Sequence, residues 1–279
     1  MTSTTEPTGA TLPDDLETLV PLIRSHTGDI TEITPTDRGS SATTLLTRTA
    51  TGTQFVKAVP NRPGGRRDSL LREAAINPYV TPVSPPMRWQ AENTAWVALG
   101  FEAIQARPAD FAPGSSDLPA VIDMMTQVCA LPLPAPARDW PETRWNRHVP
   151  DNGQALLDGD AVLYTDINPD NVQIATSGTG AWVVDWAWPT RGAALINPAC
   201  LIVQLIAAGH TPHDAERQLT GIPAWDTADP AAVNVFGTAN LSLYRAFADR
   251  HPDAEWLTAM VDATHAWLEH RDVPATDQA

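Results

Sequence analysis

Residues 163–186 read LYTDINPDNVQIATSGTGAWVVDW, and this stretch decides the fold class. The pattern predicts a hairpin, with strands over residues 171–174 and 181–184 and a turn over residues 176–180. Antiparallel pairing brings Asn171, at the start of the hairpin, close to Asp185, at its end. Amide and carboxylate oxygens suit Mg²⁺, which takes one or two protein ligands in addition to substrate phosphates. The stretch therefore predicts a magnesium site at Asn171 and Asp185.

Asp166 lies just before the hairpin, where it can orient or deprotonate a hydroxyl group. An alternative interpretation makes Asp166 and Asn168 turn residues around Pro169, because Asx side chains often hydrogen-bond to nearby backbone in turns. That alternative accounts for INPDN. It does not account for Asp185, a carboxylate at the end of an apolar strand.

Two motifs in this stretch resemble those of a known family. TDINPDN resembles the catalytic loop of the aminoglycoside phosphotransferase and choline kinase-like family, within the protein kinase-like superfamily, and VVDW resembles its metal-binding segment. The resemblance implies ATP and Mg²⁺ as cofactors, Asp166 as the catalytic base, and Asn171 and Asp185 as magnesium ligands. It also implies a two-lobed α+β fold, with a small antiparallel-sheet N-lobe that carries one key helix and a larger, mainly helical C-lobe.

Two positions depart from the family's pattern. The loop usually opens with His-Gly-Asp, whereas this chain has Tyr164, Thr165 and Asp166. Tyrosine can pack and donate a hydrogen bond as the histidine does. Members of the family often carry a second Asp before a proline, whereas this chain has Asn197. If that carboxylate supports the loop backbone, an amide can still accept the same hydrogen bonds.

Lys57 is the only lysine of the chain, which otherwise uses arginine for positive charge. In the run QFVKAV its side chain shares a strand face with Phe55 and Val59, where an ammonium group is unfavourable unless it meets an anion. The resemblance supplies that anion as the phosphates of ATP, and it makes Glu73 the ion-pair partner that positions Lys57. The alternative for Glu73 is an ordinary solvated helix residue.

The resemblance assigns further nucleotide contacts. The segment RGSSATT, residues 38–44, stands where the phosphate-covering loop is expected, so Ser40 and Ser41 are candidate phosphate contacts. Residues 99–104 resemble the hinge, whose backbone near Glu102 and Ile104 is expected to bind the adenine edge.

Trp186 and Trp188 directly follow Asp185 and are candidates to line the substrate side of the site. Tryptophans more often belong to a core or to the wall of a cleft, and that alternative stays open for both residues.

The rest of the chain fits two lobes joined near Gly100, with a cleft between them in which ligands are expected to bind. We expect a disordered N-terminus over residues 1–11, an N-lobe over 12–100, a C-lobe over 101–271 and a flexible tail over 272–279. In the N-lobe the patterns predict strands over 30–33, 43–49, 54–59, 87–90 and 96–99, and helices over 14–24 and 68–76. In the C-lobe they predict helices over 118–130, 198–209, 231–250 and 255–269.

The composition limits the partners. The 279-residue chain has a formal net charge of −15, which disfavours nucleic acid and anionic membranes and can attract cationic small molecules. The acidity can equally serve solubility alone. The chain shows no secretory signal and no apolar run long enough to span a bilayer, so we expect a soluble, cytoplasmic protein, as a monomer or homodimer.

The sequence therefore predicts a phosphotransferase that acts on a hydroxyl group of a small molecule. An aminoglycoside or another antibiotic or natural product fits the resemblance and the acidic surface. A biosynthetic metabolite kinase and a non-catalytic nucleotide- or ligand-binding relative are the alternatives. The chain contains no GxxxxGK[ST], HExxH or GxSxG motif. Their absence from the sequence disfavours a P-loop nucleotide-binding enzyme, a zinc protease with the HExxH helix and a hydrolase with the GxSxG nucleophile elbow.

Overall fold

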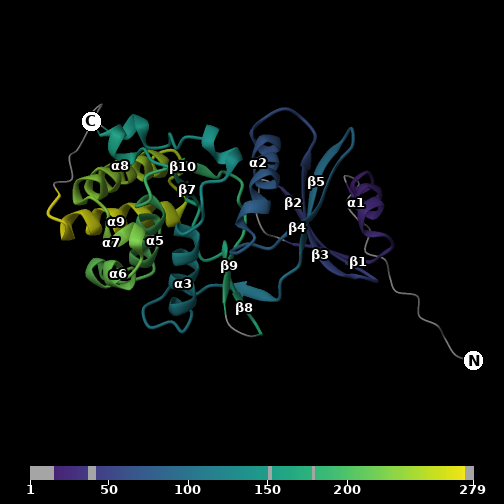
Figure 1. Ribbon diagram of the computed structural model, residues 1–279, viewed down its shortest axis with the longest axis horizontal. Coiled ribbons are helices and arrows are strands. Elements are labelled where there is room, and N and C mark those ends of the chain that lie inside the picture. Colours follow the sequence, from purple (N-terminus) through teal and green to yellow (C-terminus); the bar gives the residue numbers. More distant parts are fainter. Residues whose placement is uncertain (1–15, 37–41, 150–152, 178–179, 274–279) are drawn as a thin grey trace, which may run out of the picture. The chain divides into compact units, whose positions relative to one another are not determined.

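The computed structural model describes residues 16–36, 42–149, 153–177 and 180–273 (Figure 1). Packing divides the chain into two compact units. The first comprises residues 1–74 and 87–103, and the second comprises residues 75–86 and 104–279. The functional boundary expected near Gly100 stays a prediction.

The first unit is built on a five-stranded antiparallel sheet with the strand order β1-β2-β3-β5-β4. The alternation of side chains along β3 gives the sheet two apolar faces. Val56 and Ala58 pack with α1, whereas Phe55 and Val59 pack with Leu70 of α2. The strands are β1 (Ile30–Pro35), β2 (Thr43–Thr49), β3 (Gly52–Pro60), β4 (Met87–Glu92) and β5 (Trp96–Glu102).

Two helices accompany this sheet, and their limits differ from those predicted. The helix α1 spans Leu19–Thr27, and Pro21 does not interrupt it because the first N–H groups of a helix have no intrahelical partner. The helix α2 spans Gly65–Val80, so the predicted end at residue 76, just before Asn77 and Pro78, is wrong. Ile76 and Val80 are fully buried in the core of the second unit, and their burial offsets the backbone hydrogen bond that Pro78 cannot make.

The second unit contains two small sheets in addition to its helices (Figure 1). One has the order β6-β8-β9 and includes the predicted hairpin, and the other pairs β7 with β10. The strands are β6 (Ala106–Pro108), β7 (Ala161–Leu163), β8 (Val172–Ala175), β9 (Ala181–Val183) and β10 (Thr190–Gly192). The sequence patterns missed β6, β7 and β10 because a strand of three residues is too short for its periodicity to be recognised.

The helix α5 forms the centre of this unit, with nine of its residues buried, and contacts α3, α6, α7, α8 and α9. The four long helices predicted here are confirmed to within two residues at each end. The helices are α3 (Leu118–Cys129), α4 (Gln154–Leu157), α5 (Ile196–Ala207), α6 (Pro212–Gln218), α7 (Pro223–Asp226), α8 (Pro230–Ala248) and α9 (Glu255–His270), and two 3₁₀ turns span Ala135–Asp139 and Asn146–His148. Among the described residues, no helix is both long enough and apolar enough to cross a membrane.

Candidate active site

The loop between β7 and β8 carries Asp166. β7 ends at Leu163, and Tyr164 and Ile167 of the loop are also buried, each at most 2% exposed. These apolar anchors hold the loop backbone against the core. The side chain of Asp166, between them, stays exposed.

Asn168 shapes the turn that follows. Its Oδ1 accepts hydrogen bonds from the backbone N–H groups of Asp170 and Asn171, at 3.0 and 3.1 Å. This is an Asx turn, so the alternative interpretation is correct for Asn168. Asp166 accepts hydrogen bonds in this loop and makes no comparable turn of its own.

The amide of Asn171 is directed at Asp166. Its Nδ2 donates to the backbone carbonyl of Asp166 at 3.0 Å and to the carboxylate Oδ2 at 3.1 Å. Because a carboxylate can only accept, the amide nitrogen must face it, and the amide oxygen remains as the atom that could bind a metal ion.

The predicted hairpin is confirmed, and it brings the two ends together. Val172 pairs with Val183 in the antiparallel register, and the backbone N–H of Val184 donates to the carbonyl of Asn171 at 2.9 Å. Asp185 is the next residue along the chain. It adopts φ 63°, in the left-handed region that non-glycine residues seldom occupy and that is common at functional sites.

The surroundings raise the pKa of Asp166 above its usual value. The main cause is the surrounding protein, which restricts hydration although the side chain is exposed, and the second is the negative charge of Asp185. Arg144 and the amides of Asn171 and Asn168 act in the opposite direction. Two carboxylates close enough for one to raise the pKa of the other are typical of a site that binds a cation.

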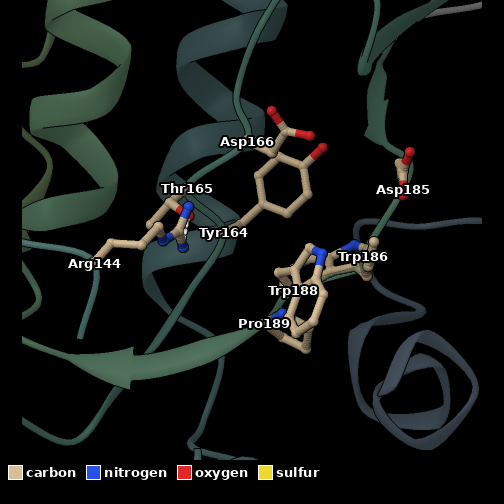
Figure 2. Close-up of a pocket in the computed structure, with 9 residues that line it drawn as sticks. Arg144, Tyr164, Thr165, Asp166, Asp185, Trp186, Trp188 and Pro189 are labelled. Carbon is tan, nitrogen blue, oxygen red and sulfur yellow. Dashed lines mark hydrogen bonds between the residues drawn. The ribbon is translucent and has the colours of Figure 1, made fainter. Parts of the chain in front are cut away.

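A pocket of about 260 Å³ in the second unit contains Asp166 and Asp185 (Figure 2). Both predicted aromatic residues line it. Trp186 is 2% exposed and packs against Tyr164 with ring centroids 4.7 Å apart, whereas Trp188 is 50% exposed. The residues that line the pocket are Arg144, Tyr164, Thr165, Asp166, Asp185, Trp186, Ala187, Trp188 and Pro189.

Sequence reasoning missed Arg144, which lines the same pocket. Its Nε and Nη2 donate to the buried carboxylate of Glu142, with Nη2 at 2.7 Å from Oε2, and Nη2 also donates to the hydroxyl of Thr165. Burial alone would raise the pKa of Glu142, but the charge and hydrogen bonds of Arg144, with a bond from Thr190, lower it overall. Arg144 lies in the Pro-rich connection after α3, where no periodic pattern or motif marks a site.

The predicted pair of Lys57 and Glu73 is confirmed within the first unit. The ammonium Nζ of Lys57 lies 2.8 Å from Oε2 of Glu73, and their side chains are only 11% and 6% exposed. The predicted strand face is also confirmed, since Phe55 and Val59 belong to the apolar cluster between β3 and α2. The role of the pair in binding phosphate stays a prediction.

Comparison with known proteins bears on these arrangements. No family model matches the chain, and a search of the curated proteins by sequence finds no match. Solved structures do match. The choline kinase LicA from Streptococcus pneumoniae is 11% identical, with a TM-score of 0.58 over 91% of this chain and 99% of that one. A putative aminoglycoside phosphotransferase from Ralstonia eutropha is 14% identical, with a TM-score of 0.57 over 93% and 98%. The macrolide 2'-phosphotransferase MphH from Brachybacterium faecium is 13% identical, with a TM-score of 0.52 over 89% and 98%.

The chain has the kinase-like fold of these phosphotransferases. The predicted fold class is therefore confirmed, and the resemblance on which it rested is supported at the level of the fold. The likeness extends over almost the full length of both chains in each comparison. At 11–14% identity it establishes the fold and leaves the chemistry to be argued from the residues.

The two departures from the family's pattern, one in the loop and one in α5, are accommodated in this structure. The hydroxyl of Tyr164 donates to the carbonyl of Val184 at 2.5 Å, which ties the loop to the residue before Asp185. Asn197, 1% exposed, accepts from the backbone N–H of Tyr164 at 2.8 Å and donates to the carbonyl of Val162 at 2.9 Å. An amide thus supports the loop backbone, as the sequence suggested, and adds a bond that a carboxylate could not donate.

The remaining predicted nucleotide contacts receive no test. Ser40 and Ser41 lie outside the described residues. Glu102 is the last residue of β5, and its exposed side chain pairs with Arg88. Ile104 follows in an irregular segment and is half-buried. A backbone contact with adenine near Glu102 and Ile104 stays a prediction.

The donor set suits magnesium better than a transition metal. Among the described residues, no group of three or more His, Cys, Asp or Glu side chains is arranged to hold a metal ion. A site that offers one carboxylate, from Asp185, and one amide oxygen, from Asn171, matches the few oxygen ligands that Mg²⁺ takes from a protein when phosphates supply others.

Proposed function

We propose that this protein is a magnesium- and ATP-dependent phosphotransferase that phosphorylates a hydroxyl group of a small molecule. The observation that carries the proposal is the arrangement of Asp166, Asn171 and Asp185 on one loop and hairpin. Asp166 opens into a pocket, Asn171 is hydrogen-bonded to it, and Asp185 is near enough for its charge to raise the pKa of Asp166. The kinase-like fold supports phosphoryl transfer by analogy.

Each residue has a role that follows from its chemistry. The exposed carboxylate of Asp166 orients the acceptor hydroxyl and accepts its proton. Asn171 fixes the rotamer of Asp166 through its amide nitrogen, and its amide oxygen binds magnesium together with Asp185. Lys57, held by Glu73, binds phosphate oxygens. When bound, Mg²⁺ and ATP supply the phosphoryl group and the cation that neutralises its charge.

Two arguments favour an active enzyme over a non-catalytic relative. Tyr164 and Asn197, which depart from the family's pattern, maintain the loop through hydrogen bonds to Val184, Val162 and the loop backbone. The negative charge of Asp185 also raises the pKa of Asp166, and like charges held near one another favour a site that binds a cation.

The identity of the acceptor is part of the proposal, because the fold does not specify it. The similar structures include enzymes described as choline, spectinomycin, macrolide and aminoglycoside kinases or phosphotransferases. We keep an antibiotic or other natural product as the expected acceptor class, with a biosynthetic metabolite as the near alternative.

The test separates nucleotide binding from transfer. Calorimetry should detect ATP binding that requires Mg²⁺, and ADP release should rise when hydroxylated acceptors are supplied. Asp185→Asn should weaken binding of the Mg²⁺ complex, whereas Asp166→Asn should leave it intact and suppress transfer.

Asp170→Asn is the matched control, because Asp170 is exposed on the same loop and does not line the pocket. Equal behaviour of Asp185→Asn and Asp170→Asn in magnesium-dependent binding would refute the proposal.

A further inference from the structure

The charge of the pocket differs from that of the chain. The chain carries 33 acidic residues against 18 basic ones, yet among the described residues Asp166 and Asp185 are the only carboxylates that line the pocket. The proposed function uses both of them, for the acceptor hydroxyl and for magnesium. The pocket therefore offers no additional carboxylate to bind the ammonium groups of a polycationic acceptor.

Arg144 supplies positive charge on the other side of the pocket. In the view of Figure 2, Arg144 and Asp185 lie on opposite sides of Asp166 and Tyr164. An acceptor whose hydroxyl lies at Asp166 can therefore extend away from Asp185 and toward the guanidinium group. A cationic substituent there would meet a like charge, whereas an anionic substituent would meet a donor.

The guanidinium of Arg144 is held rigidly with one edge unused. Glu142 engages Nε and Nη2, Thr165 accepts from Nη2, and the ring of Trp145 lies 5.4 Å from Cζ. No partner of Nη1 is present in the part of the chain that the structure describes. The side chain of Arg144 is 39% exposed, whereas that of Glu142 is 4% exposed. A fixed guanidinium with free N–H groups is preorganised to bind an oxyanion.

Two tryptophans supply the remaining features of the pocket. Trp186 lines the pocket with its side chain buried, and its Nε1 has no hydrogen-bond partner among the described residues. Trp188 keeps half of its surface exposed where it lines the pocket. An exposed indole face of this kind binds flat rings by stacking.

We infer that the acceptor is a ring-containing alcohol with a carboxylate or phosphate group, which Arg144 binds while the ring stacks on Trp188. This inference rests on the proposed function and narrows its substrate class. It argues against polycationic aminoglycosides, which the acidic composition alone would favour.

A series of para-substituted benzyl alcohols tests the inference, because its members share one ring and one hydroxyl. The substituents are carboxylate, phosphate, methyl and aminomethyl. Their binding is measured by ligand-observed NMR with Mg²⁺ and a non-hydrolysable ATP analogue present. We expect both anions to bind about tenfold more tightly than the methyl compound, the effect of one charge-assisted hydrogen bond, and the amine to bind most weakly.

Variants assign the preference to residues. The double variant Glu142→Gln with Arg144→Gln removes both charges without leaving a buried carboxylate unpaired, and it should abolish the preference for anions. Arg144→Lys keeps the positive charge but loses the planar guanidinium group that can bind an oxyanion through two N–H groups. It should therefore reduce the preference for anions. Trp188→Leu should weaken the binding of all four compounds to the same extent, because they share the ring that stacks on Trp188.

Three results would overturn the inference: tighter binding of the amine, an anion preference that survives in the double variant, or no measurable binding of any compound. These outcomes are distinct from failure of the proposed function, which is read from magnesium-dependent nucleotide binding in the absence of any acceptor. Normal nucleotide binding with a preference for the amine would reject the acceptor class alone.

Discussion

The two units differ in how their charged side chains are arranged. In the first unit, Lys57 and Glu73 bury an ammonium and a carboxylate 2.8 Å apart, so that each neutralises the other. In the second unit, Asp166 and Asp185 are like charges, and their proximity contributes to the raised pKa of Asp166. The first unit therefore pairs opposite charges, whereas the second holds two negative charges near one another. The comparison predicts that a cation bound near Asp166 and Asp185 would lower the electrostatic cost of holding these two carboxylates together.

The largest expected effect is on turnover. Asp166→Asn removes the proton acceptor but keeps the size of the side chain, and the rate of transfer should fall by about 10²–10⁴-fold, the usual contribution of a general base. Initial rates of ADP release with the best acceptor found would measure it. Asp170→Asn should keep normal rates. A fully active Asp166→Asn enzyme would show that Asp166 is not the proton acceptor.

The next largest effect is on stability in the first unit. Lys57→Met removes the cation that neutralises buried Glu73, and breaking a buried ion pair in this way destabilises a protein by about 3–5 kcal/mol. Urea unfolding followed by circular dichroism would measure the change in the free energy of unfolding.

Two matched variants complete this experiment. The double variant Lys57→Met with Glu73→Leu should recover most of the loss, because no buried charge is left unpaired. Glu32→Gln should change little, because its pair with Arg48 is solvent-exposed. If Lys57→Met proves as harmless as Glu32→Gln, the two units do not differ as described.

A third change asks what holds the like charges in place. Asn197→Ala would leave the backbone N–H of Tyr164 and the carbonyl of Val162 without their buried partner, at about 1–3 kcal/mol for each unpaired group. Thermal unfolding would measure the loss. Asn197→Asp is the matched variant, since a carboxylate can accept from Tyr164 but cannot donate to Val162 when ionised. It should be less stable than the wild type, and increasingly so as the pH rises. Equal stability of the wild type and Asn197→Asp would show that the second hydrogen bond contributes nothing.

The sequence predicted the parts of this molecule that depend on local rules. The hairpin was recognisable from two strand-like runs around a turn, and antiparallel pairing then brought Asn171 close to Asp185. Lys57 was recognisable because an ammonium on an apolar strand face needs an anion. The last residues of α2 could not be predicted from the sequence, because the burial of Ile76 and Val80 in the folded protein overrides the local effect of Pro78.

The acceptor side of the pocket was beyond sequence reasoning. Glu142 and Arg144 are only two residues apart, but their importance comes from contacts with Thr165 and Thr190, which lie elsewhere in the chain. No periodicity links these residues. Only the packing of the Pro-rich connection against the loop between β7 and β8 brings them together.

The smallest expected effect concerns pH and tests the repulsion itself. The folded-state pKa of Asp166 is raised, so the folded protein binds more protons than the unfolded chain between the ordinary value of 3.8 and the folded value. Any contribution of Asp166 to stability is therefore greatest at low pH, and it is lost as the pH rises through that window. Asp185→Asn removes one cause of the shift, so this loss should be smaller in the variant than in the wild type.

The measurement is the difference in melting temperature between Asp185→Asn and the wild type, from about pH 3 to pH 7, without ligands. It should move in favour of the variant as the pH rises, whereas the difference for Asp170→Asn should stay flat. Added Mg²⁺ should stabilise the wild type at neutral pH and leave Asp185→Asn unchanged, because the cation relieves a repulsion that the variant no longer has. A pH-independent difference would mean that the charge of Asp185 does not affect the protonation of Asp166, and the contrast between opposite charges in one unit and like charges in the other would then have no energetic basis.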